Sequence, residues 1–150
     1  MQAKEVRSLS YTFDTEIGAG RPEVWQALTG ETDRWWLPDF RMLGQGSVVE
    51  FQPHAGGQII GRMQGGGSLL WYTVQMCRPG QSIHLVGHIA PEWGGPTVSM
   101  LKWELIERGD QGTLVRTTDA LLGPVGDGGA ESAKEGWTQL IGRGLKPYVE

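Results

Sequence analysis

The sequence predicts an α+β fold in which an antiparallel sheet packs against one long C-terminal helix. The C-terminal segment repeats apolar residues at helical spacing, at Trp137, Leu140, Ile141, Leu145 and Tyr148. Most of the chain before it alternates apolar and polar residues between turns rich in Gly and Pro. A sheet with one apolar face must bury that face against another layer, and the helix supplies this layer.

The N-terminal part of the chain predicts one strand and two short helices. Residues 6–17 alternate loosely between apolar and polar side chains, which indicates a strand. A short helix follows at 22–29, with Pro22 in its first turn, where the missing N–H costs no hydrogen bond. A second helix, 32–36, ends before Pro38 because proline disfavours the helical conformation of the residue preceding it.

Six further strands are predicted before the last helix. The clearest alternation places Leu101, Trp103 and Leu105 on one face of a strand, with charged residues on the other face. Turns containing Gly or Pro separate these strands, which span 47–52, 57–63, 68–77, 81–89, 97–107 and 113–120. The C-terminal helix is expected at 131–148.

Composition is that of an ordinary domain. The 150 residues suffice to bury roughly 70% of the unfolded surface, and no repeat or boundary is visible, so we expect one domain over 1–150. A net charge of −4, without any long basic cluster, argues against nucleic acid. No apolar run reaches the ~20 residues of a membrane span, and the N-terminus lacks a signal-peptide core. We therefore expect a cytoplasmic protein that does not bind membranes.

The patterns that support metal, cofactor or nucleophilic chemistry are absent. His84 and His88 share one face of a strand but lie about 13 Å apart, too far to bind one zinc ion. Cys77 is the only cysteine and is expected to be a small buried apolar residue. The glycines at 65–67 precede a strand, not the helix that a phosphate-binding loop requires. We expect no metal and no cofactor.

One acidic residue of the last predicted strand is a candidate for catalysis. If Val115 defines the apolar face of this strand, Thr117 and Asp119 share that face and point toward the helix. A carboxylate in an apolar pocket has a raised pKa and can act as a general acid or base. The alternative is that Asp119 lies near the strand end, where it is solvated or caps the following turn.

The tryptophans give the remaining functional signal. Large rigid rings bind apolar ligands well, so several of them can line an aromatic pocket, although they can equally fill the core. For Trp25 we favour the core. The candidate ligand-binding residues are Trp36, Phe40, Trp71, Leu101, Trp103, Val115, Thr117, Asp119, Trp137, Leu140 and Ile141.

Several landmarks of the chain resemble the START-like (SRPBCC, Bet v 1-like) superfamily, and within it the branch named for the activator of Hsp90 ATPase. They are the segment 19–29, the pair Trp35-Trp36, Gly56-Gly57, Pro79-Gly80, Gly112-Thr113 and the segment 136–148. The resemblance implies the helix-grip fold, a curved seven-stranded antiparallel sheet gripping the C-terminal helix around an apolar cavity. It does not imply one function, because the superfamily includes lipid carriers, aromatase/cyclases, hormone receptors and co-chaperone domains.

Three functions remain open. The first is non-enzymatic binding of a small, largely apolar molecule between sheet and helix, favoured because no coherent set of nucleophile, base and orienting group is visible. The second is an aromatase/cyclase-like or hydrolytic enzyme that uses Asp119. The third is a protein-interaction module related to the Hsp90 activators, which carry a further N-terminal domain for which this chain has no room. A protein partner or a homodimer also remains open. Gly142 and Gly144 of the last helix allow close approach to the sheet or widen a pocket.

Overall fold

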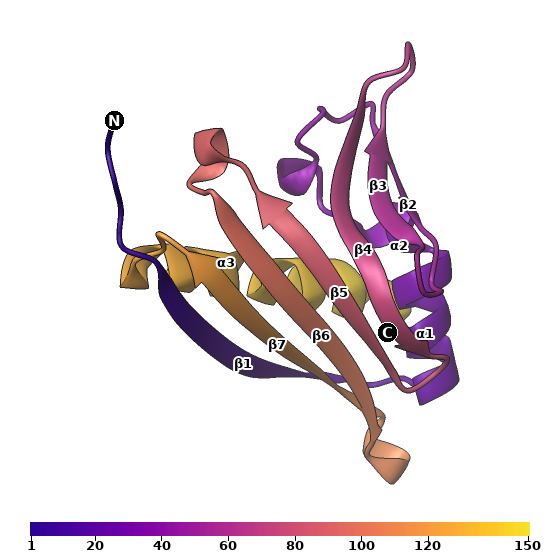
Figure 1. The fold of residues 1–150 in the computed structure, drawn as a ribbon. Coiled ribbons are helices and arrows are strands. Elements are labelled where there is room, and N and C mark those ends of the chain that lie inside the picture. The colour runs from indigo at the N-terminus through magenta and orange to yellow at the C-terminus, as the bar shows by residue number, and fades with distance from the viewer.

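The computed structural model describes residues 1–150 and contains one seven-stranded sheet with the C-terminal helix across one face (Figure 1). The strands are β1 (Arg7–Ile17), β2 (Val48–Phe51), β3 (Gln58–Arg62), β4 (Ser68–Arg78), β5 (Ser82–Ile89), β6 (Thr97–Glu107) and β7 (Thr113–Gly123). Every neighbouring pair is antiparallel, in the order β1-β7-β6-β5-β4-β3-β2. The predicted α+β fold class is confirmed.

Two short helices connect β1 to the far edge of the sheet. They are α1 (Arg21–Gly30) and α2 (Thr32–Trp35), followed by the 3-10 turn η1 (Pro38–Phe40). Two further 3-10 turns, η2 (Pro91–Trp93) and η3 (Gly109–Gln111), link the later strands. None of the helices is long and apolar enough to cross a membrane.

The C-terminal helix has three consecutive parts, α3 (Asp127–Gln139), the π-helical segment η4 (Leu140–Leu145) and α4 (Lys146–Val149). It begins earlier than the predicted residue 131 because its first turn is rich in glycine and has no apolar stripe to mark it. Tyr148 was predicted on the buried stripe but is 37% exposed. The wider π-helical turn shifts the helical phase, so Val149 packs against the core instead.

The core fills the space between the sheet and the C-terminal helix. Inward-facing residues of the central strands, among them Leu101, Trp103 and Val115, meet Ile141 and Leu145 of the helix, and all five are at most 1% exposed. This packing matches the alternation seen in the sequence, since every second residue of β6 is buried.

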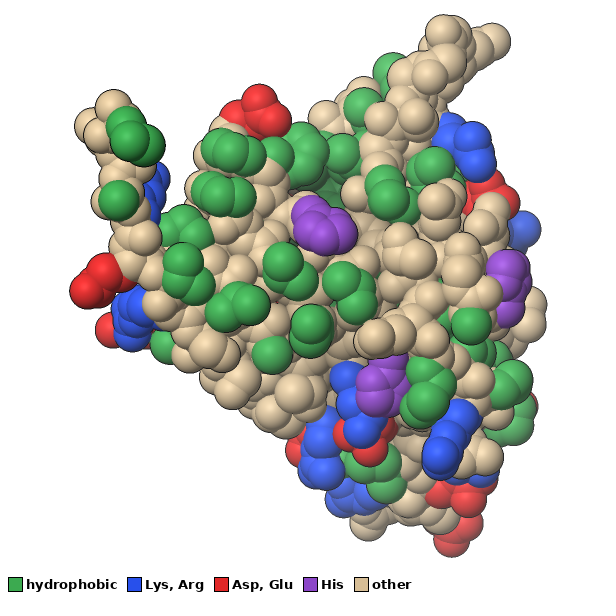
Figure 2. Space-filling view, in the orientation of Figure 1, with side chains coloured by type: hydrophobic (Ala, Val, Ile, Leu, Met, Phe, Trp, Pro, Cys, Tyr) green, Lys and Arg blue, Asp and Glu red, His purple; other side chains and the backbone are tan.

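The opposite face of the sheet is open to solvent and has two different halves (Figure 2). Near η3 it carries ion pairs such as Arg116 with Asp14, at 2.9 Å. Over the other half hydrophobic side chains gather, including Met100 and Leu122, which are 54% and 50% exposed. His88 is exposed on this face, and its cross-strand neighbour is an apolar valine. This half of the face therefore exposes several large apolar side chains.

Two central strands separate at one end of the sheet. Hydrogen-bonded pairing between β4 and β5 begins at Thr73 and Val86, whereas β5 remains paired with β6 as far as Ile89. Beyond Thr73, residues 68–72 of β4 pair only with β3. Figure 1 shows the two strands diverging at this end. We call the divergent segments, residues 68–72 and 87–89, the fork.

Candidate functional site

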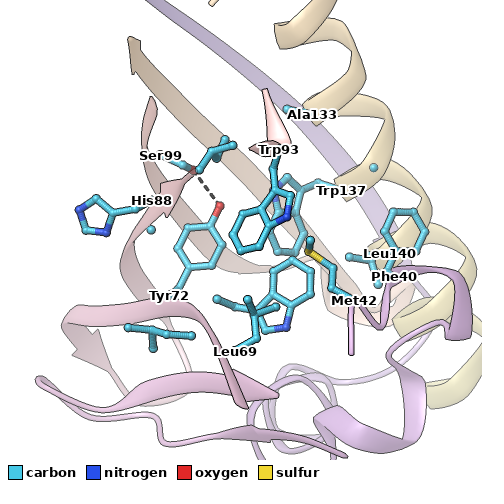
Figure 3. A pocket seen from close by; sticks show the side chains of 15 residues that line it. Phe40, Met42, Leu69, Tyr72, His88, Trp93, Ser99, Ala133, Trp137 and Leu140 are labelled. Atoms are coloured by element: carbon cyan, nitrogen blue, oxygen red, sulfur yellow. Dashed lines mark hydrogen bonds between the residues drawn. The ribbon is translucent and has the colours of Figure 1, made fainter. Parts of the chain in front are cut away.

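An apolar cavity of about 220 Å³ lies at the fork, between the sheet, α3 and the turns η1 and η2 (Figure 3). Eleven of its 15 lining residues are hydrophobic. Both arms of the fork contribute, with residues 69–72 from β4 and 87–89 from β5. Phe40, Trp93 and Trp137 approach from η1, η2 and α3. The cavity therefore forms where strand pairing stops.

A β-bulge directs two consecutive aromatic residues of β4 to the cavity. Tyr72 lies opposite Ile59 and Leu70 lies opposite Ile60, so Trp71 is the extra residue on its strand. In a regular strand, neighbouring side chains point to opposite faces, and a bulge relaxes this rule. As a result both Trp71 and Tyr72 line the cavity.

Trp137 stands at the boundary between the cavity and the core. Its ring centroid lies 5.5 Å from that of Trp103, 6.1 Å from that of Trp36 and 5.8 Å from that of Tyr72. The contacts with Trp103 and Trp36 are edge-to-face, the favoured arrangement of aromatic pairs. Trp36 is 2% exposed and also packs on Trp71, at 5.4 Å, so it lies behind the cavity wall.

Gly87 allows the Tyr72 ring to lie against the arm of the fork formed by β5. A Cβ atom on Gly87 would lie 2.8 Å from two ring carbons of Tyr72 and 2.7 Å from the carbonyl oxygen of Trp71. These distances are shorter than carbon contacts allow, so a larger residue at this position would displace the ring. The glycine thus fixes where the phenolic hydroxyl of Tyr72 sits.

A chain of hydrogen bonds links the cavity to a buried carboxylate. The hydroxyl oxygen of Tyr72 lies 2.8 Å from that of Ser99, and both residues line the cavity (Figure 3). The Ser99 hydroxyl donates to Oδ1 of Asp119 at 2.7 Å, and the Tyr11 hydroxyl donates to Oδ2 at 2.7 Å. Asp119 is 1% exposed and forms no ion pair with a Lys or Arg.

The protonation of this network follows from its burial. Burial raises the pKa of Asp119, and hydrogen bonds from Ser99, Tyr11 and the backbone N–H of Ala120 act in the opposite direction. Burial also raises the pKa of Tyr72, and the nearby carboxylate of Asp119 raises it further. The same two causes raise the pKa of Tyr11. Both phenols therefore keep their protons at neutral pH and can act as hydrogen-bond donors.

The structure separates the predicted site residues into three groups. Phe40, Trp71, Trp137 and Leu140 line the cavity, and Trp36 lies directly behind it. Asp119 does not line it but reaches it through Ser99. The remaining predicted residues are buried in the core away from the cavity and are Leu101, Trp103, Val115, Thr117 and Ile141.

These placements correct two expectations. Asp119 shares the buried face of β7 with Val115 and Thr117, so the alternative of a solvated or turn-capping carboxylate is wrong. The second correction concerns the five core residues, which do not form the cavity wall. Alternation identifies which face of a strand is buried but not where along that face the helix leaves a space, because this depends on long-range packing.

Sequence reasoning missed several lining residues at the fork and in the turns. These are Met42, Leu69, Leu70, Tyr72, Gly87, His88, Ile89, Trp93, Ser99, Ala133 and Gly136. One signal was available, because Ser99 is a polar residue in the inward phase of β6, two positions before Leu101. A hydroxyl at such a position needs a buried partner, and Ser99 finds it in Asp119 on the neighbouring strand β7.

The structure shows no cluster of three or more His, Cys, Asp or Glu side chains that could hold a metal ion. His84 and His88 project from the outer side of β5. Cys77 is partly buried, and this burial raises the pKa of its thiol. Neither the histidines nor the thiol adds chemistry to the network of Asp119.

The comparisons with known proteins concern the fold. No protein-family model matches the chain, and no curated protein matches it in sequence. Among solved structures, protein MLL2253 from Mesorhizobium loti is 19% identical with a TM-score of 0.68, covering 93% of this chain and 95% of its own. An AHSA1-like protein from Aeromonas hydrophila is 14% identical with a TM-score of 0.62, covering 94% and 92%. Ara h 8.0201 is 12% identical with a TM-score of 0.64, covering 95% and 98%.

At these identities the likeness concerns the fold alone. A sheet that grips a C-terminal helix, found in this chain and across these structures, defines the class of helix-grip proteins. The chain has the helix-grip fold that the resemblance of its sequence to the START-like (SRPBCC) superfamily implied.

Proposed function

We propose that residues 1–150 form one domain that binds a small, largely apolar molecule in the cavity at the fork, without catalysing a reaction. The observation that carries this proposal is the lining of the cavity, which is mostly hydrophobic and has two hydroxyl groups at one side. Ligand sites in proteins have this character, an apolar wall with a few placed polar groups that orient the ligand.

The lining also favours a neutral ligand. It contains no Lys, Arg, Asp or Glu, and its only titratable groups are Tyr72 and the exposed His88 at the outer edge. A charged group would leave water for this cavity without gaining an opposite charge, which is costly. We therefore expect affinity for uncharged aromatic or aliphatic compounds.

Two measurements test the binding proposal. Native mass spectrometry of freshly purified protein should detect a copurified small molecule. Titration with the neutral probe N-phenyl-1-naphthylamine should increase its fluorescence as it enters the cavity. Ala133→Phe, which adds a ring to the lining, should weaken probe binding at least about tenfold by occupying the space.

A matched control is available on the same helix. Ser132 is exposed and does not line the cavity, so Ser132→Phe adds the same ring outside it and should leave probe affinity unchanged. Equal probe binding by wild-type protein and both variants would show that the probe binds elsewhere, and the proposed cavity function would then be wrong.

One observation supports an enzyme as the second candidate. The chain from Tyr72 through Ser99 to Asp119 can accept a proton at the cavity and pass it to the carboxylate, which is the action of a general base. The copurified or probe molecule should then be converted by wild-type protein and not by Asp119→Asn, as followed by mass spectrometry. If the protein only binds, Asp119→Asn should change ligand preference and no conversion should occur in either protein.

A further inference from the structure

We infer that the cavity selects a neutral apolar molecule that carries a hydrogen-bond donor, a hydroxyl or an N–H, and binds this donor through the phenolic oxygen of Tyr72. The inference rests on the proposed binding function and specifies the chemistry of its ligand. It follows from the direction in which the hydrogen bonds of the buried network run.

The direction is set at Asp119. An ionised carboxylate accepts hydrogen bonds and cannot donate. The Ser99 hydroxyl has a single hydrogen, which it donates to Oδ1 of Asp119 at 2.7 Å. The other carboxylate oxygen is occupied by the hydroxyl of Tyr11, also at 2.7 Å. Ser99 therefore has no hydrogen left for a second bond.

The bond between Tyr72 and Ser99 must then run toward Ser99. At 2.8 Å the two oxygens are hydrogen-bonded, and only Tyr72 still has a hydrogen to supply. Once the hydrogen of Tyr72 is used in this bond, its oxygen offers the cavity a lone pair and no donor. A ligand gains a hydrogen bond to this oxygen only by donating one.

The environment of the carboxylate supports the ionised state on which this direction depends. Two hydroxyl groups and the backbone N–H of Ala120 converge on Asp119, and every one of them is a donor. The burial of Asp119 opposes ionisation, but a protonated carboxyl oxygen must donate its hydrogen, so protonation would reverse or break the hydrogen bond at that oxygen.

Other ligand classes fit this arrangement less well. A ketone or ether presents a lone pair to the lone pair of Tyr72, so that neither group is satisfied. A ligand with a carboxylate would meet no Lys or Arg in the lining. The negative charge of Asp119, which lies behind Ser99, would also repel it. Ser99 cannot serve as an alternative donor because its hydrogen is already used.

Pairs of probes that differ only in the donor test the inference. We would measure, by isothermal titration calorimetry at pH 7, the affinities of 2-naphthol and 2-methoxynaphthalene, and of indole and 1-methylindole. In each pair the methyl group removes the donor and keeps the ring. The wild-type protein should bind the donor about tenfold more tightly, the gain expected for a hydrogen bond to a polarised acceptor. The two pairs distinguish a preference for a hydroxyl from one for an N–H.

Variants of the network separate hydrogen bonding from shape. Tyr72→Phe removes the acceptor and should reduce the preference to about twofold or less, because the methylated and unmethylated probes then meet the same apolar wall. Ser99→Ala releases the Tyr72 hydrogen, which can then be donated to a ligand oxygen, so the preference within the naphthalene pair should narrow. The preference within the indole pair should remain, because 1-methylindole has no acceptor and Tyr72 still accepts from indole. Asp119→Asn supplies an amide donor to Ser99, which reverses the chain, lets Tyr72 donate to a ligand oxygen and should narrow the preference within the naphthalene pair in the same way.

The outcomes separate this inference from the proposed function. If neither member of a pair binds the wild-type protein, the proposed function fails together with the inference. If both members bind equally, or if the preference persists in Tyr72→Phe, the protein binds apolar ligands but the inference about the donor is wrong. Circular dichroism of each variant confirms that it is folded, and Ser99→Ala makes the test independent of whether Asp119→Asn folds.

Discussion

The two ends of the interface between the sheet and the C-terminal helix differ in how they are filled. At the closed end, Trp103, Val115 and Leu145 are fully buried in the core between the sheet and the helix. At the fork, large residues such as Trp71 and Trp137 line a cavity of about 220 Å³ together with small ones, which are Gly87, Ser99, Ala133 and Gly136. The cavity therefore lies where the backbones of β4 and β5 diverge and where small residues line the wall.

Two glycines show the same contrast on a local scale. Gly87 at the fork lets the Tyr72 ring lie against β5 and so positions a polar group at the cavity. Gly144 at the closed end lets the C-terminal helix approach the backbone of Trp35, where a Cβ atom would lie 2.5 Å from the carbonyl oxygen. The close approach at Gly87 shapes the cavity, whereas the close approach at Gly144 allows the helix to pack tightly against the core.

The largest expected effect compares one tryptophan from each end. Trp103→Ala should cost about 3–5 kcal/mol of unfolding free energy, because its ring is 0% exposed and the surrounding residues cannot fill the void. Trp137→Ala should cost less, since one side of its ring already borders the cavity. Urea unfolding followed by far-ultraviolet circular dichroism measures both losses. Equal losses would mean that Trp137 is an ordinary core residue.

Trp137→Ala should also change ligand binding. In wild-type protein, an apolar ligand in the cavity should quench or shift tryptophan emission because it contacts Trp71 and Trp137. The substitution should weaken this response, whereas Trp103→Ala, if folded, should retain it. A large stability loss in Trp137→Ala together with no fluorescence response of the wild-type protein to any apolar probe would contradict a binding cavity at this helix.

An intermediate effect is expected at the glycines of the π-helical segment. Gly144→Ala should destabilise the protein by about 1–3 kcal/mol, because the new methyl group overlaps the carbonyl oxygen of Trp35. Gly142 is the matched control, since a Cβ atom there meets nothing within 4 Å. Gly142→Ala should stabilise the protein by up to about 1 kcal/mol through helix propensity. If both substitutions destabilise equally, the close approach at Gly144 is not what constrains the helix.

The fold could be predicted from the sequence because its signals are local. The alternation over 97–107 gave the bounds of β6, and the apolar stripe from Trp137 to Leu145 located the helix. The strand predicted at 113–120 extends to Gly123 because β1 pairs with it as far as Arg7, which local alternation does not reveal.

The site could be predicted only in part because it depends on contacts between distant segments. Alternation placed Asp119 on the buried face, but its partners Ser99 and Tyr11 come from β6 and β1, which become its neighbours only through the order of strands. The fork itself is a change in strand pairing between Thr73 and Val86, and no residue type marks it in the sequence. The bulge at Trp71 depends on the same long-range register.

The smallest expected effect is a difference in how stability depends on pH. Burial raises the pKa of Asp119 in the folded state above its ordinary value of 3.8. The folded state therefore binds the proton of Asp119 more tightly than the unfolded state does. The stabilisation of the folded protein by this proton is fully present below pH 3.8 and is lost as pH rises through the pKa of Asp119 in the folded state. Wild-type protein should lose stability relative to Asp119→Asn over this window, at no more than about 1.4 kcal/mol per pH unit, the limit for one proton.

Asp14 on the solvent face of the sheet provides a control of opposite sign. The hydrogen bonds from Arg116 lower the pKa of Asp14 below 3.8, so its contribution is present above that value and is lost as pH falls through the folded pKa. We would measure the unfolding free energies of wild type, Asp119→Asn and Asp14→Asn between about pH 2.5 and 8, a range set by the ordinary carboxyl pKa of about 4. The differences between wild type and each variant give the two slopes of stability against pH. Slopes of the same sign for the two variants would contradict the difference between the buried carboxylate beside the cavity and the solvated one on the outer face.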